Sequence, residues 1–356
     1  MTDLSVSVGG LRLKNPVIAG SSEFTMSAVG IDACLDAGAA AVVAKSVNES
    51  AAAARQLDTA EYTLLRADWS AASWDVPSAE DTLFNRSGLA QVGLEDWLEI
   101  LGKADERARE RDAYVLGSVT VAQPGPAAEI AGRMAAAVRG IELNLGTPHA
   151  RLASKEALSR PANARAVQAY AQRVKAAVGQ ACLIVKLGSG GDVVEQARAA
   201  FAGGADAVAM IGRHQGFIPD LDSWEPILGT AAAIGGGWSL PLSLYWVSAC
   251  RQALGAAAPI VGTNGARSGR DVVRFLLSGA RAVEMASAVL MRGPAALTAA
   301  VREVERYAGA RGLGSLEELV GAAADRALTY SELKPRPQRR PWERFYQRKG
   351  GSDVRD

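Results

Sequence analysis

Two lysines stand inside apolar segments of the sequence, where a charged side chain is unfavourable. Lys45 ends the segment AAVVAK (40–45), and Lys186 lies within CLIVKL (182–187). A buried ammonium group needs an anion or a hydrogen-bond acceptor beside it. The pattern therefore has two interpretations. One is a structural ion pair or a lysine that reaches the rim of the domain; the other, which we favour, is two cations that face an electron-rich ligand.

The segment IELNLGTPHA (141–150) places polar groups within and just after an apolar stretch. Asn144 offers both a hydrogen-bond donor and an acceptor, and Thr147 and His149 follow on a Gly-Thr-Pro-His turn. Histidine is the side chain most often used for general acid–base catalysis. The chain has only two histidines, and the other, His214, also falls in a loop. We expect His149 to contact a ligand and regard His214 as the weaker candidate, because a loop histidine is often only solvated.

The segment IVGTNGARSGRD (260–271) has the pattern of an anion-binding turn. A glycine-containing turn follows an apolar run and precedes a helix whose N-cap is predicted to be Ser268. Together with RAVEMASA (281–288), it matches the phosphate site that barrels build from the loops after strands seven and eight. Backbone N–H groups in such turns can point at an anion. Two ordinary tight turns are the alternative.

Eight short apolar segments alternate along the chain with amphipathic, alanine-rich segments. This alternation predicts parallel strands joined by crossover helices, and eight repeats in 356 residues favour an α/β fold of the closed (β/α)8 TIM barrel type over an open sheet. The expected strands are 16–20, 40–45, 114–119, 141–145, 182–187, 206–211, 259–262 and 281–286. The expected helices include 94–109, 126–138, 161–178, 192–202, 242–254, 269–278 and 293–310. Side chains at the carboxyl ends of barrel strands meet at one face, where active sites lie.

Other segments lie outside this repeat. The stretch 4–15, LSVSVGGLRLKN, predicts an N-terminal β-hairpin with a Gly-Gly turn. The connections 46–93 and 212–240 are too long for simple loops; both would lie over the C-terminal face, and long loops often carry function. We predict one domain over residues 1–333 and a basic, proline-rich tail over 334–356 that forms an extended arm.

The composition excludes several classes of protein. A net charge of +1 and 49% hydrophobic residues indicate neither a nucleic-acid nor a membrane surface. No apolar run reaches the roughly 18 residues of a membrane span, and the N-terminus lacks the pattern of a signal peptide, so we expect a cytoplasmic protein. Cys34, Cys182 and Cys250 have no metal-binding spacing, and neither a metal site nor a disulfide is expected. Cys34 and Cys182 are predicted to be core residues.

Several of these segments, in this order, resemble the dihydroorotate dehydrogenase family, which includes the barrel domain of dihydropyrimidine dehydrogenase. The resemblance covers the chain from about residue 4 to 322 and is carried by NPVIAGSS, VAKS, NRSGL, IELNLGTPH, IVKL and IVGTNGARSGRDVVRFLLSGARAVEMASA. It implies a TIM barrel that binds FMN at its C-terminal mouth. This agrees with the interpretation of the lysines, because a lysine beside the flavin stabilises the negative charge of its reduced form.

The resemblance also implies roles for individual residues. The cofactor would be held by Gly20, Ser21, Lys45, Ser46, Asn144, Lys186, Gly236, Gly237, Asn264, Gly265, Ala286 and Ser287. The substrate would contact Asn85, Gly88, Leu89 and His149, and the positive charge of Arg86 and Arg213 would suit an anionic substrate. Lys45, Thr147 and His149 would be the catalytic residues.

The turn after Asn144 departs from the family pattern. One branch of the family reads Asn-Leu-Ser-Cys-Pro-Asn, with the cysteine as catalytic base; here Thr147 replaces the cysteine, and His149 replaces the last asparagine. A threonine hydroxyl is a weak base unless a partner takes its proton, so Thr147, His149 or a relay of the two is expected to handle the proton. Gly212-Arg213 replaces an Asn-Thr or Asn-Ser pair, and Ala286 replaces a phosphate-loop glycine. Because an unpaired buried polar group costs about 1–3 kcal/mol, dihydroorotate itself is not the expected substrate.

We therefore expect an FMN-dependent oxidoreductase that transfers a hydride between flavin N5 and a C–C or C–N bond of a small polar substrate. The two arginines, Arg86 and Arg213, would favour a substrate that is an anion. The chain has neither the cysteines of an iron–sulfur cluster nor a dinucleotide-binding fingerprint, so the electron acceptor is left unassigned. A homodimer is expected, as is common in the family. Two alternatives stay open: a non-redox phosphate-binding lyase or isomerase with Lys186 as a Schiff-base residue, and a flavin-binding protein without turnover.

Overall fold

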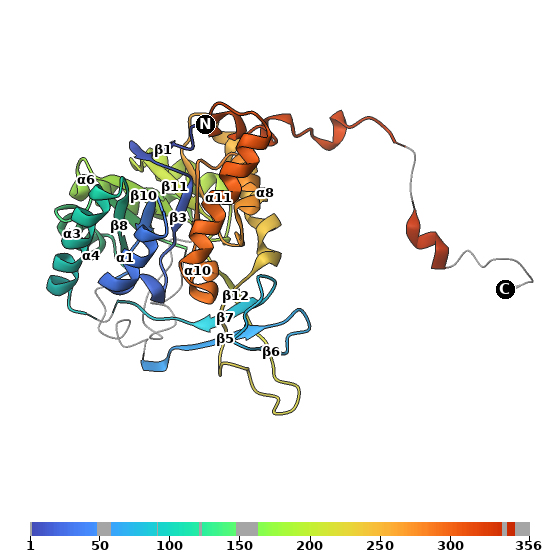
Figure 1. Ribbon diagram of the computed structural model, residues 1–356, viewed down its shortest axis with the longest axis horizontal. Coiled ribbons are helices and arrows are strands. Elements are labelled where there is room, and N and C mark those ends of the chain that lie inside the picture. The colour runs from blue at the N-terminus through green and yellow to red at the C-terminus, as the bar shows by residue number, and fades with distance from the viewer. Residues whose placement is uncertain are drawn as a thin grey trace, which may run out of the picture. The chain divides into compact units, whose positions relative to one another are not determined.

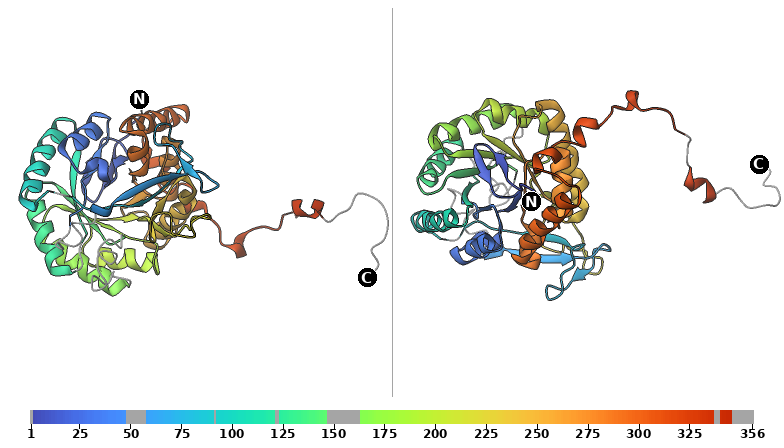
Figure 2. Two further views of the ribbon diagram at one scale, coloured as in Figure 1. Left: turned by 90° about the horizontal axis from the view of Figure 1, so that it is seen from below. Right: turned by 45° about the horizontal axis from the view of Figure 1, so that its top comes forward.

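The computed structural model describes residues 2–47, 58–90, 92–120, 123–146, 163–336 and 340–345. The chain divides into two units, Met1–Asp325 and Arg326–Asp356, which are described separately. Figures 1 and 2 show the first unit as a barrel of strands surrounded by helices.

The first unit is built on a closed barrel of eight parallel strands. Their order around the barrel is β10-β11-β14-β15-β3-β4-β8-β9, and β9 pairs with β10 to complete the ring. Each lies where the apolar segments predicted a strand. The strands are β3 (Val17–Ala19), β4 (Ala41–Val43), β8 (Tyr114–Val119), β9 (Gly140–Asn144), β10 (Cys182–Lys186), β11 (Ala207–Met210), β14 (Ile260–Thr263) and β15 (Ala282–Met285). The predicted (β/α)8 barrel is confirmed.

The helices cover the outside of the barrel, as the left view of Figure 2 shows. They are α1 (Ala28–Asp36), α3 (Leu94–Glu110), α4 (Pro124–Ala135), α6 (Ala164–Val178), α7 (Val193–Ala202), α8 (Leu240–Leu254), α9 (Gly269–Ser278), α10 (Ser287–Arg292) and α11 (Ala295–Ala310). Local sequence fixes several starting points: Asn163 and Asp192 accept hydrogen bonds from the first turns of α6 and α7. Ser268 precedes α9, as predicted. The alternation of strands and helices therefore places every strand's carboxyl end at the same face.

The N-terminal hairpin is present and lies at the opposite end of the barrel. Strands β1 (Val6–Val8) and β2 (Leu11–Leu13) pair antiparallel, and the turn between them has positive φ at Gly9 and Gly10, 53° and 87°. A side chain on Gly9 would come within 2.7 Å of Cys182 Sγ. Since Cys182 is the first residue of β10, the hairpin packs against the amino ends of the barrel strands.

The two long connections contain strands of their own. They contribute β5 (Glu61–Leu65), β6 (Ala71–Ala72), β7 (Thr82–Arg86), β12 (His214–Gly216) and β13 (Ala232–Gly235) to a second, antiparallel sheet in the order β12-β13-β7-β5-β6. Pairing of β13 with β7 joins the two connections. A small apolar cluster that includes Phe84 and Ile234 supports the sheet. It lies at the end of the barrel where the strands terminate, near the bottom of Figure 1.

The second unit, Arg326–Asp356, contains the short helical turns η6 (Tyr330–Glu332) and η7 (Pro341–Phe345). Neither turn contains a buried residue, so no hydrophobic core is found in its described part. The domain division expected at residue 333 and the extended arm stay predictions. In the described parts of the whole chain, no helix is both long and apolar enough to cross a membrane.

Candidate active site

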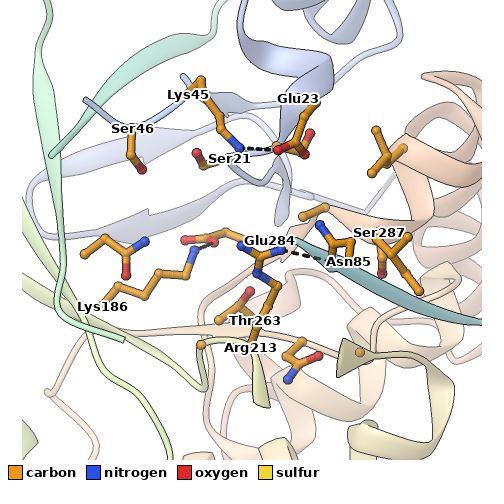
Figure 3. Close-up of a pocket in the computed structure, with 18 of the residues that line it drawn as sticks. Ser21, Glu23, Lys45, Ser46, Asn85, Lys186, Arg213, Thr263, Glu284 and Ser287 are labelled. Atoms are coloured by element: carbon orange, nitrogen blue, oxygen red, sulfur yellow. Dashed lines mark hydrogen bonds and ion pairs between the residues drawn. The ribbon is translucent and has the colours of Figure 1, made fainter. Parts of the chain in front are cut away.

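A cavity of about 930 Å³, which includes its opening to solvent, lies at the carboxyl ends of the barrel strands beside the second sheet (Figure 3). The lining comes from both sheets and from the loops that follow the barrel strands. The lining residues are Ser21, Ser22, Glu23, Lys45, Ser46, Leu83, Asn85, Gly88, Leu89, Asn144, Lys186, Ile211, Gly212, Arg213, Gly235, Thr263, Asn264, Gly265, Ala266, Glu284, Ala286, Ser287 and Leu290.

The cavity collects most of the residues that the sequence proposed for a ligand. Those assigned to the cofactor and found in the lining are Ser21, Lys45, Ser46, Asn144, Lys186, Asn264, Gly265, Ala286 and Ser287. Those assigned to the substrate and found there are Asn85, Gly88, Leu89 and Arg213. Thr147 and His149 lie outside the described residues. The weaker candidate, His214, is on β12 with its ring 5.6 Å from that of Trp238, and it is not among the lining residues.

Four other predicted residues stand in or beside the wall rather than in the lining. A Cβ on Gly20 would be 3.1 Å from that of Ala286, and one on Gly236 would be 3.1 Å from Thr82 Oγ1. Gly237 is covered by an arginine described below. Arg86 forms an ion pair of 2.6 Å with Glu61 on the second sheet. These glycines therefore allow close packing behind the lining.

Lys45 has a carboxylate partner inside the cavity. Its Nζ is 2.6 Å from Oε1 of Glu23, and the lysine side chain is 5% exposed. Burial alone would raise the pKa of Glu23, but Lys45 and Arg213 outweigh this and hold the pKa below its ordinary value. Burial raises the pKa of Tyr62, and the neighbouring Glu23 carboxylate raises it further. Glu23 is thus a carboxylate at neutral pH, set between two cations.

Lys186 has two carboxylate partners, Glu142 at 3.2 Å and Glu284. Burial tends to lower the pKa of Lys186, but the two carboxylates overcome this and raise the pKa. Burial raises the pKa of Glu142 to about 8, and the nearby Glu284 adds to this effect. Both lysines are therefore ion-paired, as the first interpretation states, and both line the cavity; that they face an electron-rich ligand stays a prediction.

Arg213 fixes the orientation of Asn85. Its guanidinium donates to Asn85 Oδ1 at 3.1 Å and to Ser87 Oγ at 2.7 Å. The Nδ2 group of Asn85 is buried without a hydrogen-bond partner in the described structure. An unsatisfied buried donor costs about 1–3 kcal/mol. An acceptor atom on a bound ligand would satisfy it.

Asn264 presents a second unsatisfied amide after β14. Ser239 Oγ donates to Asn264 Oδ1 at 3.0 Å, and the Nδ2 of Asn264 is buried without a partner among the described residues. The backbone of Asn264 has a φ of 72°, which is uncommon for a residue other than glycine. Gly265 follows with a φ of 98°, and a Cβ there would lie 2.5 Å from Leu240 N. The turn thus holds a polar amide at the cavity in a conformation that strains the backbone, as is common at binding sites.

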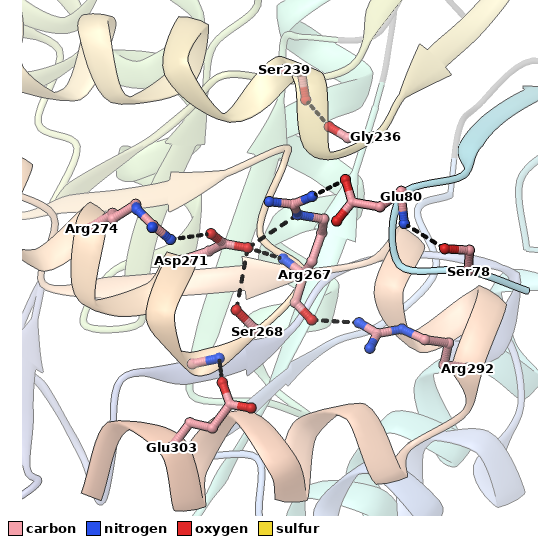
Figure 4. A network of polar contacts seen from close by, with 11 residues as sticks. Ser78, Glu80, Gly236, Ser239, Arg267, Ser268, Asp271, Arg274, Arg292 and Glu303 are labelled. Atoms are coloured by element: carbon pink, nitrogen blue, oxygen red, sulfur yellow. Dashed lines mark hydrogen bonds and ion pairs between the residues drawn. The ribbon is translucent and has the colours of Figure 1, made fainter. Parts of the chain in front are cut away.

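Arg267 forms polar contacts that hold the cavity wall beside the turn at 264–265 (Figure 4). Its backbone N–H donates to Asp271 at 2.9 Å, and its guanidinium pairs with Glu80 at 2.5 Å. A Cβ on Gly237 would lie 2.5 Å from Arg267 Nη1. The first turn of α9 is capped by the chain's own carboxylates, since Glu303 also accepts from Gly269 N at 2.8 Å. Any anion site here therefore depends on the turns at 264–265 and 286–287.

The carboxylates of this site are what sequence reasoning overlooked. Glu142 and Glu284 lie in apolar strands, at 0% and 2% exposure, so they carried the same signal as the lysines. Glu23 and Tyr62 lie outside such strands and carried no comparable signal. In the described residues, no group of three or more histidine, cysteine or acidic side chains is placed to hold a metal ion. The three cysteines are free and buried.

The model of the family described as dihydroorotate dehydrogenase matches residues 73–307. The chain is 27% identical over 324 residues to the catalytic subunit of dihydroorotate dehydrogenase B (NAD(+)) from Pyrococcus abyssi, which covers 90% of this chain and 99% of that protein. The same subunit from Geotalea daltonii is 29% identical over 328 residues, 90% of this chain and 98% of its own. Dihydroorotate dehydrogenase A (fumarate) from Lactobacillus helveticus is 26% identical over 293 residues, 81% and 88% of the two chains. The resemblance in the sequence is thereby confirmed, and the chain belongs to the dihydroorotate dehydrogenase family of oxidoreductases.

Proposed function

We propose that the cavity binds FMN and that the protein is an FMN-dependent oxidoreductase of the cytoplasm. The observation that carries this proposal is that nine residues assigned to the cofactor from the sequence line one cavity. Bound FMN would supply hydride transfer at N5, most simply for a CH–CH bond. The buried, unsatisfied amide of Asn264 fits such a ligand, because the cofactor offers many acceptor atoms.

The protein's own groups divide into two sets in this proposal. Asn144 and Lys186 hold the polar edge of the cofactor, where Lys186 stabilises negative charge. Asn264 and Gly265, with the turn at 286–287, lie where the phosphate would be bound. Arg267, which packs closely against Gly237, would stabilise the position of these turns.

The substrate that we propose is small, polar and anionic, and is not dihydroorotate. Two cations, Lys45 and Arg213, face a single carboxylate, Glu23, in this part of the cavity, so a negative charge on the substrate would balance the excess. The free Nδ2 of Asn85 would donate to it. Gly88 and Leu89 would contact the body of the substrate. The amides that the family uses at positions 149 and 212 are absent, and a ring that needs them would bind poorly.

The colour of the purified protein tests the cofactor. We expect a yellow protein that absorbs at about 450 nm and releases a compound with the mass of FMN. A colourless protein that binds phosphorylated sugars would favour a lyase or isomerase, and borohydride trapping at Lys186 would identify the Schiff base.

Turnover separates an enzyme from a flavin-binding protein. After anaerobic photoreduction, a panel of oxidised acceptors is added, and the return of the yellow colour is followed. We expect small anionic acceptors to reoxidise the protein faster than their neutral analogues, and orotate to react poorly. Reoxidation by none of them would favour the non-catalytic alternative.

We also propose a homodimer in which the second sheet forms the contact. Its hairpin after β12 displays Leu221 and Trp224, 85% and 88% exposed. Asp220 holds this hairpin by accepting hydrogen bonds from Asp222 N and Ser223 N, and Trp224 has a φ of 62°. A bulky residue held out in a strained conformation suggests a contact role.

Light scattering tests the dimer. The wild-type protein should have twice the mass of one chain, and Trp224→Ser should shift the equilibrium toward the monomer. Val29→Ser is the control, since Val29 is 79% exposed and belongs to α1 rather than to the second sheet. A wild-type mass of one chain would exclude the dimer, and an unchanged mass in Trp224→Ser would exclude this contact.

A further inference from the structure

A chain of buried polar side chains crosses the interior of the barrel beneath the cavity. Ser46 Oγ is 2.8 Å from Ser118 Oγ, and Ser118 donates to Glu142 Oε1 at 3.3 Å. Lys186 Nζ donates to Glu142 Oε2 at 3.2 Å and also to Glu284. We call these five residues the buried polar chain. They come from four barrel strands and the loop after β4, and none is more than 9% exposed.

The charges in the buried polar chain do not balance. Two carboxylates share one ammonium group, and Lys186 is the only cation that pairs with either of them in the described structure. The neighbours of the two carboxylates on the adjoining strands do not offset this charge. Ser118 on β8 does not titrate, and Glu284 lies beside Ile18 and Thr263, which are uncharged. Full ionisation would leave a net negative charge in the protein interior, which is unfavourable. Burial and the Glu284 carboxylate raise the pKa of Glu142 to about 8, in agreement with this argument.

We propose that Glu142, beside the carboxylate of Glu284, holds one exchangeable proton near neutral pH, and that it takes up a proton from solvent when the cavity above it gains negative charge. The proposal rests on the proposed binding of FMN. Lys186 and Glu284 both line the cavity. A hydride brings two electrons and one proton, so its arrival adds one negative charge beside Lys186. That charge competes with the carboxylates for the ammonium group and so favours binding of a proton at Glu142.

The two serines provide a route for this proton. Glu142 is 0% exposed, so its carboxylate has no direct access to solvent. Ser46 lines the cavity, and each hydroxyl can donate one hydrogen bond while it accepts another. A proton can therefore pass between the cavity and Glu142 through Ser118. Glu142 and Glu284 act through Lys186 in this proposal and are positioning residues.

The reduction potential of the holoprotein tests the proposal. Above pH 8 the oxidised protein lacks the extra proton, so reduction should take up one more proton than in Glu142→Gln. For a two-electron couple a tenfold change in an equilibrium is about 30 mV. The wild-type potential should therefore fall more steeply with pH than that of Glu142→Gln, by about 30 mV per pH unit. Glu317→Gln is the control, since it removes an ion-paired glutamate of η4 (Leu316–Leu319), and it should keep the wild-type slope.

Infrared spectroscopy tests the same proton without any variant having to bind cofactor. The wild-type protein should show the carbonyl band of a protonated carboxylic acid at pH 6.5 that is lost by pH 9.5, and Glu142→Gln or Glu284→Gln should change it. Absence of this band, or equal slopes in the wild type and Glu142→Gln, would overturn the inference. A protein without flavin would instead overturn the proposed function, and the infrared result would still decide whether the proton is present.

Discussion

Replacing His149 with alanine is expected to lower the rate of hydride transfer between substrate and cofactor by about 10²–10⁴-fold. The segment after β9 carries Thr147 at the position where the family has its base, and a threonine hydroxyl needs a partner to accept its proton. His149, two residues later in the sequence, is the residue of this segment that can do so near neutral pH. Thr147→Ala should have an effect of similar size if the two residues act as one relay, and the double variant should then be no slower than either single one.

Anaerobic stopped-flow measurement of the half-reaction provides the rate, with the acceptor found in the reoxidation screen. His149→Asn restores the amide that the family usually has, so it should retain substrate affinity better than His149→Ala and still be slow. His214→Ala is the matched control, because His214 packs against Trp238 and does not line the cavity. Wild-type rates in both alanine variants across the pH range would show that the proton role assigned to this turn is wrong.

The barrel could be predicted because each of its strands is a nearly continuous apolar segment. CLIVK in β10 and AVAM in β11 are buried at every position, as expected of parallel strands covered on both faces. The second sheet lacks such a signal. Its strand β12 is HQG, which is partly exposed, and β6 has two residues. These strands are stabilised by pairing between β7 and β13, far apart in the chain, and a local sequence pattern does not encode that pairing.

The same distinction explains what was found of the site. Lys45 and Lys186 are recognisable because each is a charge in an apolar segment. The pairing of Glu284 with Lys186 is not, because Glu284 on β15 meets Lys186 on β10 across the barrel interior, with β11 and β14 between the two strands in the ring. Which interior positions face each other depends on strand order and closure. The sequence therefore predicted charged groups at the cavity without predicting that these groups neutralise one another.

Replacing Lys186 with methionine is expected to destabilise the protein by about 3–5 kcal/mol at pH 9, because two buried carboxylates lose the one cation that pairs with them among the described residues. Methionine preserves most of the length of the lysine side chain, so loss of packing is small. Lys103→Met is the matched control, since Lys103 pairs with Glu99 on the surface of α3, where both side chains are more than 60% exposed. An exposed pair of this kind contributes little to stability, because solvent screens it.

The loss of stability in Lys186→Met should also depend on pH, with a sign that follows from proton linkage. Burial already raises the pKa of Glu142 in the wild type, to about 8, and removal of the ammonium group raises it further. The folded variant then binds more protons than the unfolded chain, so its free energy of unfolding falls as the pH rises above the ordinary carboxyl pKa. Urea unfolding of protein stripped of cofactor, at pH 6 and pH 9, measures this. We expect Lys186→Met to lose less unfolding free energy at pH 6 than at pH 9. At pH 9, the double variant Lys186→Met/Glu142→Gln should recover part of that loss. An equal loss at both pH values would mean that the carboxylates are not left charged.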